Sequence, residues 1–330
     1  MNFEKVSVIV PILNEELYIE NCLESLLSQD YPRDYMEIIL VDGMSTDRTL
    51  EIIQKYVEKY PFIKLVKNEK KIIPCALNLG IKNASGDYIV RMDAHAFYEK
   101  DYISKSIEYL IKTGADNVGG PTRVEGKMFV QKVVAAAYSS PFALGGSKHY
   151  DDNFEGEVDT VSWGTFKKQF LIDIGMYDER LPKSEDDDLN YRINKNGGKV
   201  FITPKIKSTY YPQNNLSGLF RQYFNYGFWK VAGIKKHKNP ARLAHLVPMA
   251  FVAFFVIFGI LSFFNLNARN LFAGVMACYF ALNFYFSFKN KKAISFNMKC
   301  YLLIVHILIH VAYGLGFWAG IFKFSDIDFD

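Results

Sequence analysis

Three long apolar runs near the C-terminal end constrain this chain more than any other feature. They cover residues 244–265, 271–288 and 301–322, and each approaches the ~20 residues that a membrane-spanning helix needs. Most charged residues precede position 243. The sequence therefore predicts an N-terminal domain over residues 1–215 and a membrane domain with about three helices over 244–322. Between them, residues 216–243 mix aromatic and basic side chains, which is typical of an amphipathic segment at a lipid interface.

Basic residues flank the first two apolar runs and indicate how the chain is oriented in a membrane. They are Lys235, Lys236, Lys238 and Arg242 before the first run, and Lys289, Lys291, Lys292 and Lys299 after the second. Because basic loops stay on the cytosolic side, three spans would keep the N-terminal domain in the cytosol. The same topology puts the acidic tail, Asp326, Asp328 and Asp330, outside. We expect a multi-pass protein of the inner or plasma membrane.

Polar or helix-breaking residues inside the apolar runs leave a second topology open. Pro248, Asn283, His306 and His310 interrupt the apolar sequence, as in a hairpin with one re-entrant or interfacial segment. No basic stretch with an apolar leader precedes the strand-like residues 6–10, so no secretory signal is expected. Both topologies leave the N-terminal domain in the cytosol.

Cysteine spacing and net charge narrow the classes of ligand. The four cysteines have no metal-like spacing, which favours reduced structural thiols in a reducing compartment. The net charge of +4 is explained by the basic cluster beside the membrane, where it would meet anionic lipid. No motif indicates nucleic-acid binding.

Short β-branched runs alternate with amphipathic helical stretches through the first 92 residues. This alternation predicts an α/β domain of the nucleotide-binding type, with a mainly parallel sheet covered on both faces. Ligands of such open sheets bind at the carboxyl ends of the strands. Residues 11–15, 42–47 and 93–95 all stand at such ends. Residues 115–212 are expected to complete the sheet and to build the acceptor side.

Asp42 follows four apolar strand residues and is the first candidate for donor binding. A carboxylate there can accept hydrogen bonds from a uracil ring or a ribose hydroxyl, whereas Ser45 or Asp47 can cap the next helix. Asn14 and Glu15 stand at the end of the first strand. They are candidates for the same site or simple turn residues.

Asp93 and His95 are separated by one residue at the end of a buried strand, so both can approach one cation. A divalent cation there would bridge the diphosphate of a nucleotide-sugar and neutralise the charge that develops when the glycosidic bond breaks. The histidine shifts the preference from Mg²⁺ toward Mn²⁺. The alternative is a structural histidine at a strand end.

Four acidic residues, 185–188, open a predicted helix, where the helix dipole favours carboxylates. Adjacent like charges also raise a pKa, as a general base requires. Asp186 is our candidate base, and helix geometry prevents all four acids from pointing into one pocket. Upstream, the loop with Trp163 and Gly164 either stacks on a sugar ring or belongs to the core.

Four motifs in this order resemble the family 2 glycosyltransferases, which have the GT-A fold. They are residues 8–15, residues 41–47, the Asp-x-His triplet 93–95 in place of the family's Asp-x-Asp, and residues 185–189. Residues 91–96, 139–142, 145–147 and 221–227 are further similar to succinoglycan-type exopolysaccharide transferases. The resemblance covers residues 5–212.

The resemblance implies roles for individual residues. Pro11, Glu15, Asp42 and Asp93 would contact the nucleotide, with Asn14 beside them; His95 would replace a metal-binding Asp, and Asp186 would be the base. The acceptor side is assigned to Trp163, Gly164, Glu185 and Arg192.

The expected activity is inverting transfer of a hexose from a UDP-sugar to a polyprenyl-diphosphate-linked saccharide, with Mn²⁺ or Mg²⁺, for exopolysaccharide or capsule. Two alternatives remain open. One is transfer directly to polyprenyl phosphate. The other is a non-catalytic membrane scaffold for polysaccharide assembly proteins.

Overall fold

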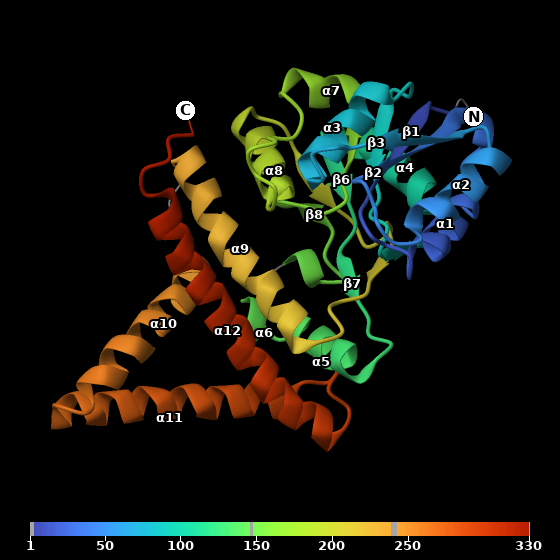
Figure 1. The fold of residues 1–330 in the computed structure, drawn as a ribbon. Helices are drawn as coiled ribbons and strands as arrows, with labels where there is room; N and C mark the ends of the chain where they lie inside the picture. Colours follow the sequence, from blue (N-terminus) through green and yellow to red (C-terminus); the bar gives the residue numbers. More distant parts are fainter. Residues whose placement is uncertain (1–2, 146–147, 239–242, 330) are drawn as a thin grey trace. The chain divides into compact units, whose positions relative to one another are not determined.

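The computed structural model describes residues 3–145, 148–238 and 243–329, which form two compact units. The first unit comprises Met1–Arg123 and Lys148–Tyr210, and the second comprises Val124–Ser147 and Tyr211–Asp330 (Figure 1). The described residues 124–145, which the sequence-based boundary at 215 assigns to the first domain, therefore pack with the C-terminal helices. The expected contributions of Gly146, Ser147, Arg242 and Asp330 lie outside the described residues.

A mixed sheet of eight strands forms the first unit, in the order β3-β2-β1-β4-β9-β6-β10-β8. Strands β1 to β4 pair in parallel, and β9 pairs antiparallel with β4 and β6. The bounds are β1 Val6–Ile12, β2 Met36–Asp42, β3 Ile63–Lys67, β4 Tyr88–Arg91, β6 Asn117–Gly119, β8 Gly156–Glu157, β9 Thr165–Lys167 and β10 Val200–Ile202. The predicted mainly parallel α/β sheet is confirmed, and β6, β8, β9 and β10, which lie within residues 115–212, complete it.

Continuous apolar strands explain why this sheet is covered on both faces. All seven residues of β2 are buried, as are six of the seven in β1, and a strand buried on both sides reads as an unbroken apolar run. The helices of this unit are α1 Ile19–Leu27, α2 Thr49–Lys59, α3 Ile73–Asn83, α4 Tyr102–Thr113, α7 Lys168–Asp173 and α8 Glu185–Lys195. Two 3₁₀ turns cover Arg33–Tyr35 and Lys148–Tyr150.

A second, three-stranded sheet has the order β5-β11-β7, with bounds Ala96–Tyr98, Ser208–Tyr210 and Thr122–Val124. Its strands β7 and β11 are neighbours, and the chain passes from each directly into the second unit. The second unit is therefore tethered at two adjacent strands.

The described part of the second unit is helical, with α5 Phe129–Tyr138, α6 Pro141–Leu144, α9 Leu216–His237, α10 Leu243–Leu261, α11 Leu266–Lys289 and α12 Phe296–Phe324. Helices α11 and α12 are long and apolar enough to cross a membrane, and the segment His245–Leu261 of α10 is a shorter apolar helix. All three helices form where the apolar runs predict them. Within this unit, α10, α11 and α12 are the three sides of a triangle (Figure 1).

Helix α9 packs along the C-terminal half of α12 at very short range. A Cβ added to Gly316 would lie 2.0 Å from the Phe224 carbonyl oxygen, and one added to Gly227 would lie 2.1 Å from that of Tyr313. Glycine at these positions lets the two backbones touch. The predicted amphipathic segment is therefore a helix buried on one side against protein.

Candidate functional site

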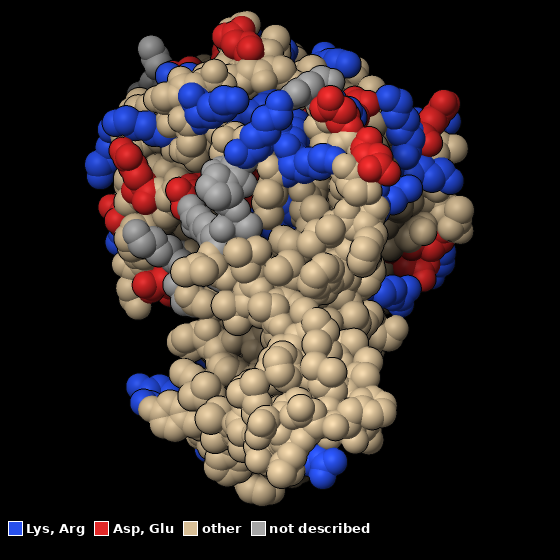
Figure 2. Space-filling view, turned by 90° about the vertical axis from the view of Figure 1, so that its left-hand side faces the viewer, with Lys and Arg blue, Asp and Glu red and all other residues tan. Residues whose placement is uncertain are grey.

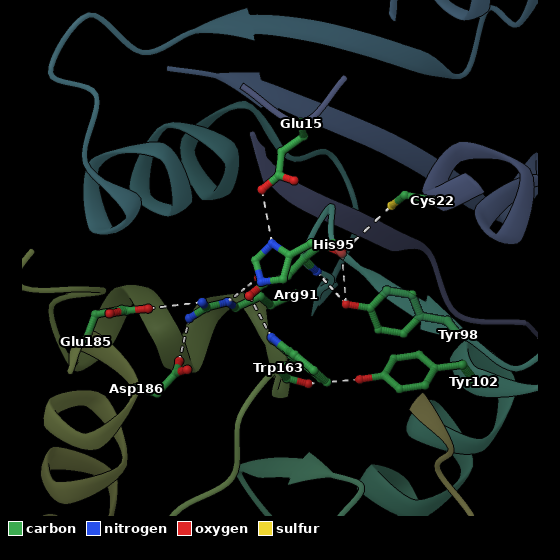
Figure 3. A network of polar contacts seen from close by, with 10 residues as sticks. Glu15, Cys22, Arg91, His95, Tyr98, Tyr102, Trp163, Glu185 and Asp186 are labelled. Atoms are coloured by element: carbon green, nitrogen blue, oxygen red, sulfur yellow. Dashed lines mark hydrogen bonds and ion pairs between the residues drawn. The ribbon is translucent and has the colours of Figure 1, made fainter. Parts of the chain in front are cut away.

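Arg91, the last residue of β4, lies at the centre of a buried network of polar contacts (Figure 3). Its guanidinium donates to Asp93 Oδ1 at 3.1 Å, to Asp186 Oδ1 at 2.6 Å and to Glu185 Oε1 at 3.0 Å. The side chain is only 4% exposed. One cation therefore holds together two acidic segments that are about ninety residues apart in the sequence.

The carboxylates around Arg91 differ in exposure and in proton affinity. The side chain of Asp186 is 22% exposed, against 13% for Asp93 and 8% for Glu185. Burial raises the pKa of Asp186 to about 8; Arg91 opposes this, whereas Glu185 and Asp93 add to it. Burial raises the pKa of Asp93, but the charges of Arg91 and His95 lower it by more, so the net shift is downward. Asp186 thus combines raised basicity with access from solvent.

Trp163 fixes the other side of Asp93. Its indole Nε1 donates to Asp93 Oδ2 at 2.7 Å, and its carbonyl oxygen accepts from the Tyr102 hydroxyl at 3.0 Å. The Asp93 backbone N–H donates to the Tyr98 hydroxyl at 2.5 Å. Trp163 is 7% exposed and has a φ of 52°. Its contacts indicate that it orients Asp93, and its burial leaves little ring surface for stacking on a sugar.

His95 and Glu15 bring the ends of two strands together. His95 Nδ1 lies 3.1 Å from Glu15 Oε1, and the His95 side chain is 39% exposed. Burial lowers the pKa of His95. The contact with Glu15 and the charge of Asp93 raise this pKa by more than burial lowers it, so the net shift is upward. The predicted proximity of Glu15, Asp93 and His95 is present in the structure.

Asp42 and Asn14 join two loops beside this network. The fully buried Asp42 carboxylate accepts from the Ser45 backbone N–H and, at 2.6 Å, from its hydroxyl. Asn14, with a φ of 55°, accepts from the Thr46 backbone N–H at 2.8 Å. Pro11 pairs in register with Val41 on the neighbouring strand. Asp42 therefore shapes its own loop, and its assignment to the nucleotide stays a prediction.

The acidic turn of α8 divides as helix geometry predicts. Glu185 and Asp186 face Arg91, whereas the Asp188 carboxylate, 1% exposed, pairs with Arg192 at 3.0 Å. The Thr160 hydroxyl donates to Asp187 at 3.5 Å. Glu185 and Asp186 thus share Arg91, whereas Asp187 and Asp188 have other partners.

Two residues assigned to the acceptor, Arg192 and Gly164, also have structural contacts. Arg192 donates to the carbonyl oxygens of Ile174 and Met176 besides pairing with Asp188. A Cβ at Gly164 would lie 2.1 Å from Asn117 Oδ1, so this glycine is required by packing. These contacts do not test an acceptor role, and the assignment of Arg192 and Gly164 to the acceptor stays a prediction.

Arg91, Tyr98 and Tyr102 were missed as functional residues by sequence reasoning. The available signal was Arg91 itself, since a charged side chain within a buried strand needs acidic partners. Burial lowers the pKa of Arg91. The charges of Asp186, Asp93 and Glu185 outweigh this effect and raise that pKa well above its usual value.

The residues at this sheet edge fit a cation that is also held by substrate. The described residues contain no group of three or more His, Cys, Asp or Glu side chains that could hold a metal alone. Yet Mg²⁺-type sites often use one or two protein ligands and complete the shell with phosphate oxygens and water. Even with Asp186 protonated, the single charge of Arg91 is shared between the carboxylates of Asp93 and Glu185, so the site can attract a cation.

The fold and this site define a nucleotide-sugar-type α/β domain, and comparisons identify its family. The "Glycosyl transferase family 2" model matches residues 7–168. A succinoglycan biosynthesis protein, ExoA, of Rhizobium meliloti is 29% identical over 324 residues, 96% of this chain and 95% of that protein. A dolichyl N-acetyl-α-D-glucosaminyl phosphate 3-β-D-2,3-diacetamido-2,3-dideoxy-β-D-glucuronosyltransferase of Methanococcus voltae is 32% identical over 280 residues, covering 81% and 85%. The chain belongs to the family 2 glycosyltransferases.

Solved structures support the GT-A fold. The mannosyltransferase PcManGT of Pyrobaculum calidifontis, in complex with GDP-Man and Mn²⁺, has a TM-score of 0.67 and 20% identity, covering 95% of this chain and 87% of that one. S. aureus TarS 1-349 with UDP-GlcNAc has a TM-score of 0.50 and 17% identity, covering 97% and 92%. Chains with this fold thus bind different nucleotide-sugars.

Proposed function

We propose that this glycosyltransferase is an inverting enzyme that transfers a hexose from a UDP-sugar to a polyprenyl-diphosphate-linked saccharide for exopolysaccharide or capsule. The names of the two relatives described above support this proposal, because one concerns succinoglycan biosynthesis and the other a sugar linked to a dolichyl phosphate. Family membership favours this enzyme over a non-catalytic scaffold. The donor sugar and the accepting hydroxyl are left to experiment.

The exposure of Asp186 beside Arg91 is the observation that carries the assignment of the base. In an inverting displacement, the acceptor oxygen attacks the anomeric carbon, the bond from that carbon to the diphosphate oxygen breaks, and UDP leaves. The hydroxyl proton must pass to a carboxylate. Asp186 is more exposed than Asp93 and Glu185, and its pKa is raised by burial, so it is the carboxylate suited to take that proton.

Arg91 and Trp163 then act as positioning residues. Arg91 holds Asp186 at 2.6 Å and Asp93 at 3.1 Å, so base and donor side keep a fixed separation. Trp163 locks the second oxygen of Asp93. A 1 Å displacement of a base costs much of its effect, so this bracing matters for rate.

Asp93 and His95, with Glu15 beside them, would hold a divalent cation against the donor. Mn²⁺ or Mg²⁺ bound there would neutralise the negative charge that develops on the diphosphate leaving group. Mn²⁺ is the better match because an imidazole is a softer ligand than a carboxylate. The nucleotide side of the site would comprise Pro11, Asn14 and Asp42.

We place the first unit at the cytosolic face of the plasma membrane, which the second unit would enter through its α10–α11 helix pair. Basic residues on both sides of the α10–α11 pair support this orientation. Holding the site beside a lipid-borne acceptor raises the effective concentration of that acceptor.

The experiment is nucleotide release by the purified, detergent-solubilised protein, measured over a panel of UDP- and GDP-sugars with Mn²⁺, Mg²⁺ or EDTA. Synthetic polyprenyl-diphosphate saccharides and polyprenyl phosphate are offered separately as acceptors. We expect UDP release from one donor, abolished by EDTA and stimulated by the lipid-linked saccharide. If only polyprenyl phosphate stimulates release, the proposed acceptor is wrong and polyprenyl phosphate takes its place. If nucleotide is released only from a GDP-sugar, the proposed UDP-sugar donor is wrong.

A further inference from the structure

Helix α12 satisfies the length and hydropathy criteria for a membrane span, yet its surroundings differ from those of α11. The apolar window of α11 is 11% buried inside the protein, whereas that of α12 is 44% buried. Buried residues follow one side of α12 along its whole length, from Met298 to Phe324. Helix α12 is thus a core helix of its unit, and α11 exposes its apolar side chains.

The N-terminal end of α12 is fixed to a segment that cannot cross a bilayer. The centroids of the Tyr301 and Phe129 rings are 5.4 Å apart, and in the middle of α12 His310 Nε2 lies 2.8 Å from the Phe142 carbonyl oxygen. Phe129 begins α5 five residues after Val124, the last residue of β7. Five extended residues reach at most about 18 Å, and the hydrocarbon core is about 30 Å thick. This end of α12 therefore lies on the same side as the first unit.

The C-terminal end of α12 is fixed to α9. The Lys235 ammonium donates to the carbonyl oxygens of Phe324 and Ser325. Helix α9 begins six residues after β11 and is not among the described helices that pass the membrane-span criteria. It carries Arg221, Lys230, Lys235 and Lys236, and such cations are costly in hydrocarbon. Both ends of α12 are thus held by elements of one side.

The α10–α11 hairpin has the opposite character. Both ends of the hairpin contact the helices around α12. At the α10 end, the Trp318 indole of α12 donates to the Met249 carbonyl oxygen at 3.1 Å. At the α11 end, the Asn290 side chain donates to the Ala136 carbonyl oxygen of α5 at 2.8 Å. Its arms expose large apolar side chains, including Phe255, Ile257, Ile260, Phe280, Leu282 and Phe284. The lower part of Figure 2, at the height of α10 and α11 in Figure 1, carries almost no charged side chains.

We propose that the α10–α11 hairpin alone enters the bilayer, whereas α12 lies along the membrane surface and its acidic tail stays on the side of the catalytic unit. Basic residues then flank the hairpin at both ends, where anionic headgroups would meet them. The occupant of the exposed hairpin faces is lipid hydrocarbon. This arrangement replaces the three-span topology, in which Asp326 and Asp328 lie across the membrane.

The test is the sidedness of the tail in the full-length protein. Asp326→Cys, with Asp328→Cys as a second position, is introduced after serine has replaced the four native cysteines. Lys55→Cys, on the 64% exposed side chain of α2, marks the catalytic side. A membrane-impermeant maleimide is applied to intact spheroplasts and to inverted vesicles. We expect the tail cysteine to react in the same preparation as Lys55→Cys, and reaction in the other preparation would overturn the proposal.

A second reading avoids cysteine replacement. A C-terminal epitope tag on the otherwise unchanged chain is exposed to protease in the same two preparations. The separate Lys55→Cys variant shows which side the catalytic unit faces. If that side is the cytosol, the proposal predicts that protease removes the tag in inverted vesicles and leaves it intact in spheroplasts. Removal of the tag only on the side opposite Lys55→Cys would show that α12 crosses.

Discussion

A single guanidinium organises the site at the scale of the residue. Arg91 has a planar fork that can satisfy several carboxylates at once, and Asp93, Glu185 and Asp186 occupy it. Buried charges are tolerated only when they are paired and hydrogen-bonded. Arg91 therefore allows carboxylates needed for chemistry to remain close together in a largely buried place.

Replacing Arg91 tests this dependence. Arg91→Met leaves three carboxylates without their shared partner, and we expect the free energy of unfolding to fall by about 3–5 kcal/mol. Arg91→Lys keeps the positive charge but lacks the planar guanidinium, so its free energy of unfolding should lie between those of the wild type and Arg91→Met. The readout is the thermal unfolding midpoint in detergent. Arg180→Met, at a 55% exposed ion pair, is the control and should change stability by less than about 1 kcal/mol. Equal effects at the two positions would contradict the role of Arg91.

The raised pKa of Asp186 predicts a pH-dependent effect on stability. Its pKa of about 8 in the folded protein exceeds the usual 3.8, so the protonated form stabilises the fold at low pH and this contribution is lost as pH rises through about 8. Asp186→Asn cannot ionise. In EDTA, we expect Asp186→Asn and wild type to differ little at acidic pH and the variant to melt higher at pH 9. Parallel melting curves across this range would refute the shift.

Sequence reasoning located Asp93, His95 and Asp186 because strand ends and acidic helix starts are visible locally. It assigned no role to Arg91, because its partners Glu185 and Asp186 are far away in the sequence and only the sheet brings them near. It also gave Asp42 a ligand role, which stays a prediction, and it did not show that the Asp42 carboxylate accepts hydrogen bonds from Ser45. Local pattern reveals which residues are chemically suitable, and tertiary contacts decide which of them are already occupied.

Helix α8 carries the candidate base, and its position depends on a buried amide pair at the scale of the element. Asn190, 1% exposed, accepts from the Asn117 side-chain amide at 2.6 Å and donates to Thr160 Oγ1 and the Val161 carbonyl oxygen. These contacts join α8 to β6 and to the loop that leads to Trp163.

Asn190→Ala should therefore lower both stability and rate. It leaves several buried polar groups without partners, at about 1–3 kcal/mol for each unsatisfied group. Thermal unfolding and initial transfer rate are measured together. Asn194→Ala is the matched control, because the Asn194 side chain lies one turn later, is exposed, and makes one described hydrogen bond, to the Asp159 carbonyl oxygen at 2.9 Å. If the two variants behave alike, Asn190 does not position α8.

The contact between α9 and α12 depends on the absence of side chains. Gly316→Ala places a methyl group where the Phe224 carbonyl oxygen lies, so the helices must separate and stability should fall by about 1–3 kcal/mol. Gly274→Ala, on α11, meets nothing within 4 Å and should be neutral or stabilising by up to about 1 kcal/mol. Melting of the two variants in detergent is the measurement, and a neutral Gly316→Ala would contradict the close packing.

The order of the two units in the chain was predictable at the scale of the whole molecule, but their composition was not. The drop in charge after residue 243 marks the apolar helices, and alternating strands and helices mark the sheet. The sequence did not predict that the described residues 124–145 belong to the second unit, because α5 is a short apolar helix with no feature that separates it from the core of the first unit. Its partner Tyr301 is distant in the sequence. Only the folded chain reveals this insertion.

The most direct test of the account compares transfer by Asp186→Asn and Asp187→Asn with a lipid-linked acceptor, the preferred UDP-sugar and Mn²⁺. Loss of the base should slow transfer by Asp186→Asn about 10²- to 10⁴-fold while UDP binding, measured by titration, is retained. Asp187→Asn alters the neighbouring carboxylate, which accepts a hydrogen bond from the Thr160 hydroxyl, and should keep most of the rate. A near-normal rate for Asp186→Asn would contradict the central claim.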